Sequence, residues 1–418
     1  NAHIRSNLIN DIPLNFALLE LLAQSSANAH DNFDSLFVPF RCMVADVFSQ
    51  KSIAVKKGSL VEAVRGTFTV PLIYRPVKVD NQYVFDGGLY NNFPVDIMKE
   101  EFKPDYIIGT NVSSKVYNEY PKDTDEKLMN RVLLYLLVSK SDSTSLGKNG
   151  LYLQPDMTNL SAANFKPVAE LIKQGYDATI ADMPKIKKAV SRRVSFEELQ
   201  VRRTRFLNRN PPLIFSSVTA TGINSSQKKY VERVFKDTTN ISLESVKKSY
   251  YKLVADDNFE TVYPRMSYQP EKDAYDFELQ VKPEKNFNVD IGGVASTRPL
   301  SNAYLGLQYN YLNSNSYTFA ASFYSGSFYE SASTTTRMDI PTHIPFFLEG
   351  EFTYNHWNYS NSSQIFLESS KPNYIEQADR RITLKAGIPA FKNGKIKAEL
   401  GYIDFSNEFS PVNNFTLA

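Results

Sequence analysis

The pattern of apolar and polar positions divides the chain into three stretches, and the first, residues 1–207, mixes helical and strand spacing. This mixture predicts an α/β domain. A helix is expected after Asp11 and Pro13, which suit a cap and a first turn. Its apolar face would carry five leucines: Leu14, Leu18, Leu19, Leu21 and Leu22. Strands are predicted at 40–47 and 83–85, a buried parallel strand at 106–112, and helices at about 125–140 and 162–190.

The second stretch, residues 212–283, predicts a small α+β domain. The polar, proline-paired sequence from Asn208 to Pro212 cannot continue a helix and marks a boundary. A β-α-α-β-β pattern follows it. The first strand covers Leu213 to Thr219 and is ended by Gly222. The helices cover 225–235 and 243–254 with Ser242 as a cap, and the last two strands cover 259–268 and 274–281.

The third stretch, residues 286–418, alternates strictly between apolar and polar side chains. The alternation is clear in 287–291, 305–311, 317–323, 346–355, 382–388 and 396–402. Strands of about 9 to 11 residues with one apolar face are typical of an antiparallel transmembrane β-barrel, although a soluble β-sandwich also alternates. Tyrosines near strand ends favour the membrane. The side chains expected to face lipid are Phe287, Leu305, Leu307, Phe319 and Phe323.

The number of strands leads to a further expectation. About six or seven strands are fewer than the 8 that the smallest barrels use, and an open edge is not stable in hydrocarbon. We therefore expect a barrel that is incomplete in this sequence or is closed by another chain.

Composition and charge restrict the classes of protein to which this chain could belong. A formal net charge of +2 argues against a nucleic-acid binder that relies on a basic field. The single cysteine, Cys42, excludes an intrachain disulfide. No run approaches the roughly 18 apolar residues of a transmembrane helix, and the N-terminus has no signal-peptide pattern. An exported protein would therefore be seen here in mature or truncated form.

Residues 185–205 hold eight Lys or Arg and two Glu. This segment indicates a solvated helix and linker or, alternatively, a surface for anionic lipid.

The most informative segment runs from Phe40 to Val95. It contains Val44-Ala45-Asp46, then Thr67 followed by Val70-Pro71, and finally Asp86-Gly87-Gly88 ahead of an Asn91-Asn92-x-Pro94 turn. Asp-Gly alone is a favoured hairpin turn. Here, however, the triplet follows a predicted strand and the rest of the motif is in order. The whole segment resembles the second half of the patatin-like phospholipase family.

The resemblance assigns roles to individual residues. In patatins the aspartate of this triplet is the base of a Ser-Asp dyad, and Asp86 matches it. Such a base must be held within about 3 Å of its nucleophile. Gly87 and Gly88 would let the backbone turn sharply beside Asp86 and leave room for an acyl chain or the nucleophile loop. Asp46 matches a recurring family position and is expected to be structural, while Asn91 and Asn92 are expected to cap the turn. None of His3, His30, His343 and His356 has the context of a triad.

The chain also departs from the family. The Gly-x-Ser-x-Gly nucleophile motif and the glycine-rich oxyanion loop, which patatins carry upstream, do not occur in it. The sequence either lacks its N-terminal part or is a patatin relic without a nucleophile. Incompleteness at both ends favours the first interpretation, and we expect no activity from this chain alone.

Taken together, the three stretches resemble patatin-like proteins fused to Omp85-family barrels, the type Vd autotransporters. The resemblance implies a patatin-like hydrolase domain at 1–207, a periplasmic POTRA-like domain at 212–283, and outer-membrane barrel strands at 286–418. It implies hydrolysis of a phospholipid or other lipid ester in a Gram-negative outer membrane, with no cofactor or metal. The lipid, the side of the membrane that the hydrolase occupies, and a homodimer are left open. The alternatives are an inactive Omp85-type translocation or insertion protein that docks through its patatin-derived domain, and a soluble periplasmic protein with a β-sandwich tail.

Overall fold

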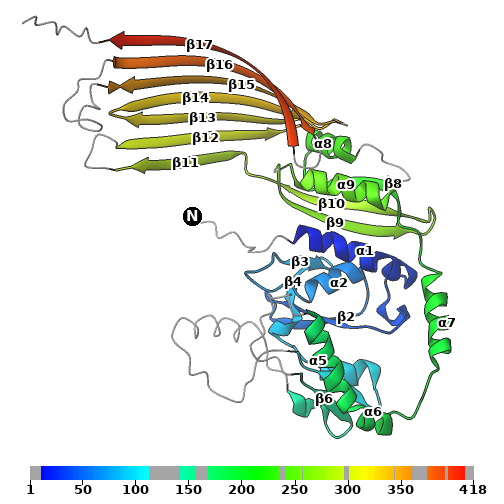
Figure 1. Ribbon diagram of the computed structural model, residues 1–418. Coiled ribbons are helices and arrows are strands. Elements are labelled where there is room, and N and C mark those ends of the chain that lie inside the picture. The colour runs from blue at the N-terminus through cyan, green and yellow to red at the C-terminus, as the bar shows by residue number, and fades with distance from the viewer. Residues whose placement is uncertain are drawn as a thin grey trace, which may run out of the picture. The chain divides into compact units, whose positions relative to one another are not determined.

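The computed structural model describes residues 11–112, 142–155, 168–235, 241–256, 258–295, 301–342, 344–359, 374–390 and 394–409 (Figure 1). The chain falls into two compact units, Asn1–Pro212 and Leu213–Ala418. The helix predicted at about 125–140 lies outside the described residues. The three predicted domains, 1–207, 212–283 and 286–418, stay a prediction.

The first unit contains a four-stranded antiparallel sheet of order β2-β1-β4-β3. Its strands are β1 (Cys42–Asp46), β2 (Lys51–Val55), β3 (Val77–Val79) and β4 (Gln82–Asp86). Helices α1 (Ile12–Asn28) and α2 (Leu60–Gly66) bring Phe16 and Ala63 to a core shared with Val44 and Val84. The strands predicted at 40–47 and 83–85 are thus confirmed, and β1 and β4 occupy the middle of the sheet.

Helix α1 forms where predicted, but of the five predicted leucines only Leu19 is fully buried. Leu21 is 73% exposed, whereas Phe16, Leu19 and Ala23 are buried. The buried residues are three and four positions apart, so they share the face of α1 that packs against the rest of the unit. The densest run of leucines does not lie on that face. Asp11 occupies the cap position, but its carboxylate accepts no hydrogen bond from the helix. It pairs with Arg65 instead, at 2.7 Å.

The remainder of the first unit is built from short elements. Strand β5 (Ile107–Thr110) pairs with β6 (Gly150–Leu153) in parallel, as predicted, but only one face of β5 is buried because Ile108 is exposed. The other elements are η1 (Phe33–Ser35), η2 (Gly87–Leu89), α3 (Val95–Ile97), the π-helical turn η3 (Met98–Phe102), η4 (Ser143–Leu146), α5 (Val168–Ala181), α6 (Met183–Ala189) and α7 (Phe196–Leu207).

The second unit begins with a small α+β fold that follows the predicted β-α-α-β-β order, with the two-residue strand β8 added between the helices. Its elements are β7 (Ile214–Thr221), α8 (Ser225–Phe235), β8 (Ile241–Ser242), α9 (Leu243–Val254), β9 (Phe259–Gln269) and β10 (Ala274–Pro283). The sheet order is β8-β7-β10-β9, with β7 and β10 parallel. Helices α8 and α9 lie on one side of this sheet (Figure 1). Ser242 caps α9 as predicted, because its hydroxyl accepts from the backbone N of Ser245.

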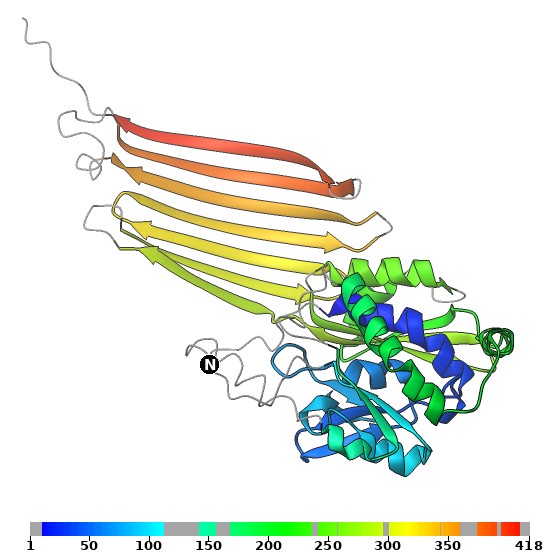
Figure 2. The same ribbon diagram turned by 60° about the horizontal axis from the view of Figure 1, so that its bottom comes forward.

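A seven-stranded antiparallel sheet completes the second unit (Figure 2). The strands are β11 (Phe287–Val294), β12 (Asn302–Leu312), β13 (Ser316–Gly326), β14 (Tyr329–Ile340), β15 (Phe346–Asn358), β16 (Tyr374–Ala390) and β17 (Gly394–Phe409). Each strand pairs with its neighbour in sequence, and β11 and β17 are the edges. The six predicted segments are confirmed as strands, whereas β14 was not predicted.

The register gives this sheet two different faces. Leu305 lies opposite Phe323, and Phe319 lies opposite Tyr309, so these side chains share one face, and all four are exposed. On the other face, Lys385 forms ion pairs with Glu349 and Glu351. The predicted alternation is therefore confirmed, and the contact of the apolar face with lipid stays a prediction. Among the described helices, none is long and apolar enough to cross a membrane.

Candidate active site

Asp86 is the last residue of a central strand and does not lie in a hairpin turn between residues 81–85 and 89–93. Strand β4 pairs with β1 and β3, and residues 89–93 form no ladder with residues 81–85. The backbone N of Asp86 donates to the carbonyl of Thr69 at 3.0 Å. After Asp86 the chain enters η2, and α3 begins directly after Pro94. The predicted strand, turn and helix are thus present, and the hairpin interpretation is wrong.

The Asp86 carboxylate is half-buried and oriented by the backbone. Its Oδ1 accepts a hydrogen bond from the backbone N of Gly88 at 2.8 Å. Burial raises the pKa of this carboxyl above its ordinary value, and the Gly88 hydrogen bond opposes that shift. The carboxylate is therefore a better proton acceptor than an exposed aspartate, which is the property that a general base needs.

Close packing requires glycine at position 87, whereas position 88 meets only side-chain atoms. A Cβ on Gly87 would lie 2.3 Å from the carbonyl oxygen of Met43 in β1, and one on Gly88 would lie 2.8 Å from Oδ1 of Asn92. Neither is among the glycines with positive φ. The expectation that these glycines leave room for an acyl chain or a nucleophile loop stays a prediction. Gly87 brings the turn after Asp86 against β1.

The other predicted site residues hold local turns. The Asp46 carboxylate accepts from the backbone N of Phe48 at 3.0 Å and from the hydroxyl of Ser49 at 2.6 Å, which fixes the turn from β1 to β2. Asn91 donates from Nδ2 to Asp96 at 2.9 Å, next to the start of α3. Asn92 lies against Gly88. In the β1–β4 register Asp46 is two residues beyond Val44, the partner of Asp86.

Arg65 is a site residue that the sequence analysis missed. Its side chain is almost completely buried. The guanidinium donates to Asp11 at 2.7 Å, to Asn15 at 2.8 Å and to the hydroxyl of Thr69 at 2.8 Å. Since the Thr69 carbonyl accepts from the Asp86 backbone, this buried cluster supports the end of β4. A charged residue four positions before Thr69 within an apolar helix was the available signal.

Two aromatic rings complete the enclosure of Arg65. The guanidinium carbon lies 5.1 Å from the ring centre of Phe68 and 4.7 Å from that of Tyr74. Such stacking favours a planar cation over a compact ammonium. The segment from Phe68 to Tyr74 is therefore attached to the buried arginine at both ends.

Comparison with known proteins identifies this region. Residues 15–99 match the family model for patatin-like phospholipase. This segment is patatin-like. It contains all four strands of the first sheet, Arg65 and Asp86.

The similar proteins cover only parts of the chain. An uncharacterized NTE family protein of Mycobacterium tuberculosis is 25% identical over 158 residues, which are 32% of this chain and 27% of the relative. A probable lipid hydrolase of Invertebrate iridescent virus 6 is 36% identical over 56 residues, which are 12% of this chain and 19% of the relative. The chain thus spans about a quarter of the length of the mycobacterial relative.

Two solved structures show a weaker likeness. CdiB from Acinetobacter baumannii is 9% identical with a TM-score of 0.33, covering 72% of this chain and 54% of its own. BamA from Haemophilus ducreyi lacking POTRA domains 1–3 is 11% identical with a TM-score of 0.27, covering 46% of this chain and 48% of its own. Scores this low support no inference about this chain.

The lone cysteine lies in the patatin-like segment and is expected to be unreactive. Burial raises the pKa of the Cys42 thiol to about 12. At pH 8 only about one thiol in 10⁴ is then a thiolate, the form that reacts. We expect Ellman's reagent to label Cys42 very slowly in the folded chain and rapidly in urea. Equal labelling rates in both conditions would contradict the burial.

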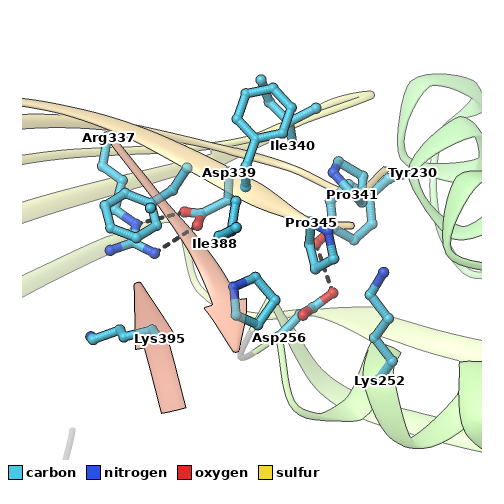
Figure 3. A pocket seen from close by; sticks show the side chains of 14 residues that line it. Tyr230, Lys252, Asp256, Arg337, Asp339, Ile340, Pro341, Pro345, Ile388 and Lys395 are labelled. Carbon is cyan, nitrogen blue, oxygen red and sulfur yellow. Dashed lines mark hydrogen bonds and ion pairs between the residues drawn. The ribbon is translucent and has the colours of Figure 1, made fainter. Parts of the chain in front are cut away.

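A cavity of about 200 Å³ lies outside the patatin-like segment, at the ends of β14 to β17 beside α8 and α9 (Figure 3). Within it, Arg337 pairs with Asp339, and the Tyr230 hydroxyl donates to Asp256 at 2.8 Å. None of its lining residues is Ser, Thr, Cys or His. This cavity therefore has none of the usual hydrolase nucleophiles in its lining. The apolar opening expected beside Asp86 stays a prediction.

Proposed function

We propose that this chain provides the base-carrying part of a lipid acyl hydrolase with a Ser-Asp dyad. The observation that carries the proposal is the placement of Asp86 within the patatin-like segment. Its half-buried carboxylate lies at the end of a central strand, is held by Gly88, and has a raised pKa.

The chemistry follows from the proton affinity of Asp86. The serine oxygen attacks the acyl carbonyl of the lipid ester while Asp86 takes the hydroxyl proton. Asp86 then gives this proton to the leaving alcohol, which departs and leaves an acyl-serine. Next, Asp86 takes a proton from water as the water oxygen attacks the acyl-serine. The fatty acid leaves and the serine regains its proton, so Asp86 acts twice as base and twice as acid.

The test of this proposal is ester hydrolysis by the complete protein, compared between the native chain and Asp86→Asn. The amide keeps the shape of the carboxyl group but cannot accept the proton. Loss of hydrolysis in a folded variant supports the proposal. Undiminished hydrolysis would show that Asp86 is not the base and only shapes the turn.

We further propose that residues 286–418 are strands of an Omp85-type barrel in the outer membrane and that residues 212–283 form a periplasmic POTRA-like domain. The support is the two-faced sheet, whose apolar face exposes large side chains such as Ile291, Leu384 and Leu400. An exposed apolar surface of this extent needs a cover, and lipid provides one without a second sheet.

The membrane proposal predicts an asymmetric response to charge. Leu307 shares the apolar face with Val289 and Ala321, its partners in β11 and β13, and Gln308 points to the other face. Leu307→Arg is expected to lower the free energy of unfolding from bilayers by about 2 to 4 kcal/mol. The matched variant Gln308→Arg should change it by less than about 1 kcal/mol. Equal effects in a urea titration of protein folded into vesicles would show that lipid does not cover this face.

A further inference from the structure

Leu72 has an unusual backbone conformation for its side chain. Its φ is +70°, in the left-handed region that residues with a Cβ rarely adopt. Among the described residues, the other non-glycine positions with positive φ are all polar: His30, Asp31, Gln50, Asp80, Asn81, Lys103 and Asp273. Leucine has no polar side chain to compensate this conformation through a local hydrogen bond. Leu72 is also 61% exposed. Leucine is therefore unfavourable here for two reasons: its backbone conformation is strained, and its apolar side chain is exposed to water.

The turn that carries Leu72 is fixed in place. The backbone N atoms of Ile73 and Tyr74 both donate to the carbonyl of Val70, at 3.2 and 3.0 Å. On one side Thr69 is buried and bonded to Arg65, and on the other Tyr74 stacks on the same arginine. The conformation of Leu72 is thus imposed by well-anchored neighbours, which is the usual condition for strain to persist.

This turn lies beside the proposed base. Thr69, whose carbonyl accepts from the Asp86 backbone, is three residues before Leu72. Three Cα–Cα steps span at most about 11 Å, and the turn shortens that span. An exposed leucine is therefore held within about 11 Å of the residue that bonds the Asp86 backbone.

We propose that Leu72 is a specificity-determining residue that contacts the acyl chain of a long-chain lipid ester at a membrane surface. This inference rests on the proposed hydrolase function. An apolar side chain in this position gains free energy only when it leaves water. A long acyl chain provides that environment, whereas a short soluble ester does not. Leu72 thus favours membrane lipids over soluble esters as substrates.

The test uses Leu72→Gly in the complete protein with two substrates. We expect hydrolysis of dioleoyl-phosphatidylglycerol in vesicles to fall about 10-fold or more, because the contact of a leucine is lost. Hydrolysis of the soluble ester p-nitrophenyl butyrate should change less than about 2-fold. The melting temperature should rise by about 2 °C, because glycine adopts this φ without strain. Leu72→Asn, which tolerates the conformation but is polar, should give the same loss on vesicles.

Lys103→Gly is the matched control, because Lys103 also has a positive φ, of 47°, and follows the η3 turn. It should raise the melting temperature similarly and leave both hydrolysis rates unchanged. An equal loss on both substrates in Leu72→Gly, or no loss on vesicles, would overturn the inference. A different variant tests the proposed function itself. If Asp86→Asn hydrolyses both substrates at the native rate, the proposed function is wrong, whatever Leu72→Gly does.

Discussion

Replacing Asp86 with asparagine is expected to lower lipid-ester hydrolysis at least about 10²-fold, the low end of general-base effects. The amide cannot take the serine proton, but it can still accept the hydrogen bond of Gly88, because asparagine caps as well as aspartate. The fold should therefore be retained. Hydrolysis by the native protein should also decline as the pH falls through the raised pKa of Asp86, because only the carboxylate is a base.

The stability of the same variant provides its control. Because the folded pKa of Asp86 is raised above the ordinary 3.8, the folded state binds this proton more tightly than the unfolded state. The charged carboxylate thus destabilises the fold at neutral pH, and the penalty disappears as the pH falls through the raised pKa. Asp86→Asn should be at least as stable as the native chain at pH 7, with the difference closing in acid. Urea titrations at both pH values would measure this. A variant that unfolds readily at pH 7 would contradict the assigned burial.

Replacing Arg65 with methionine is expected to lower the free energy of unfolding by about 3 kcal/mol, the low end for removing one partner of a buried ion pair. The low end applies because the side chain of Asp11 keeps 19% of its surface exposed and can reach water. Asn15 and Thr69 are buried and would lose their donor. Arg65→Lys should recover only part of the loss, because an ammonium cannot reproduce the planar fork between two rings.

Arg192→Met is the matched control for Arg65→Met, because Arg192 is exposed in the segment between α6 and α7. Its effect should stay within about 0.5 kcal/mol. Urea titration of both variants measures the difference. Similar small effects would show that the Arg65 cluster contributes little to the stability of the patatin-like segment.

Local signals in the sequence were sufficient for much of the fold. The alternation of 305–311 and 382–388 and the cap at Ser242 depend on residues a few positions apart, and the corresponding elements formed where predicted. Strand β14 was missed because Thr334 and Thr336 occupy its apolar-face positions, opposite Phe352 and Phe319, so that its two faces differ little in polarity.

The remaining features depend on contacts between distant residues. Packing against the rest of the unit determines which face of α1 is buried. The number and spacing of leucines within α1 do not predict that face. The carboxylate of Asp11 pairs with Arg65, 54 positions away, and does not cap its own helix. The packing that requires Gly87 comes from Met43 in a neighbouring strand. The motif identified Asp86, but the cluster that supports it became apparent only from the structure.

The central claim is that Asp86 activates a serine, and fluorophosphonate labelling of the complete protein tests it most directly. The reagent reports serine nucleophilicity whatever the lipid substrate is, and mass spectrometry identifies the labelled residue. We predict that the native protein is labelled on one serine and that Asp86→Asn, folded at pH 7, is labelled at least about 10²-fold more slowly. Equal labelling rates for the two proteins, or no labelled serine in a native protein that hydrolyses lipid esters, would contradict the claim.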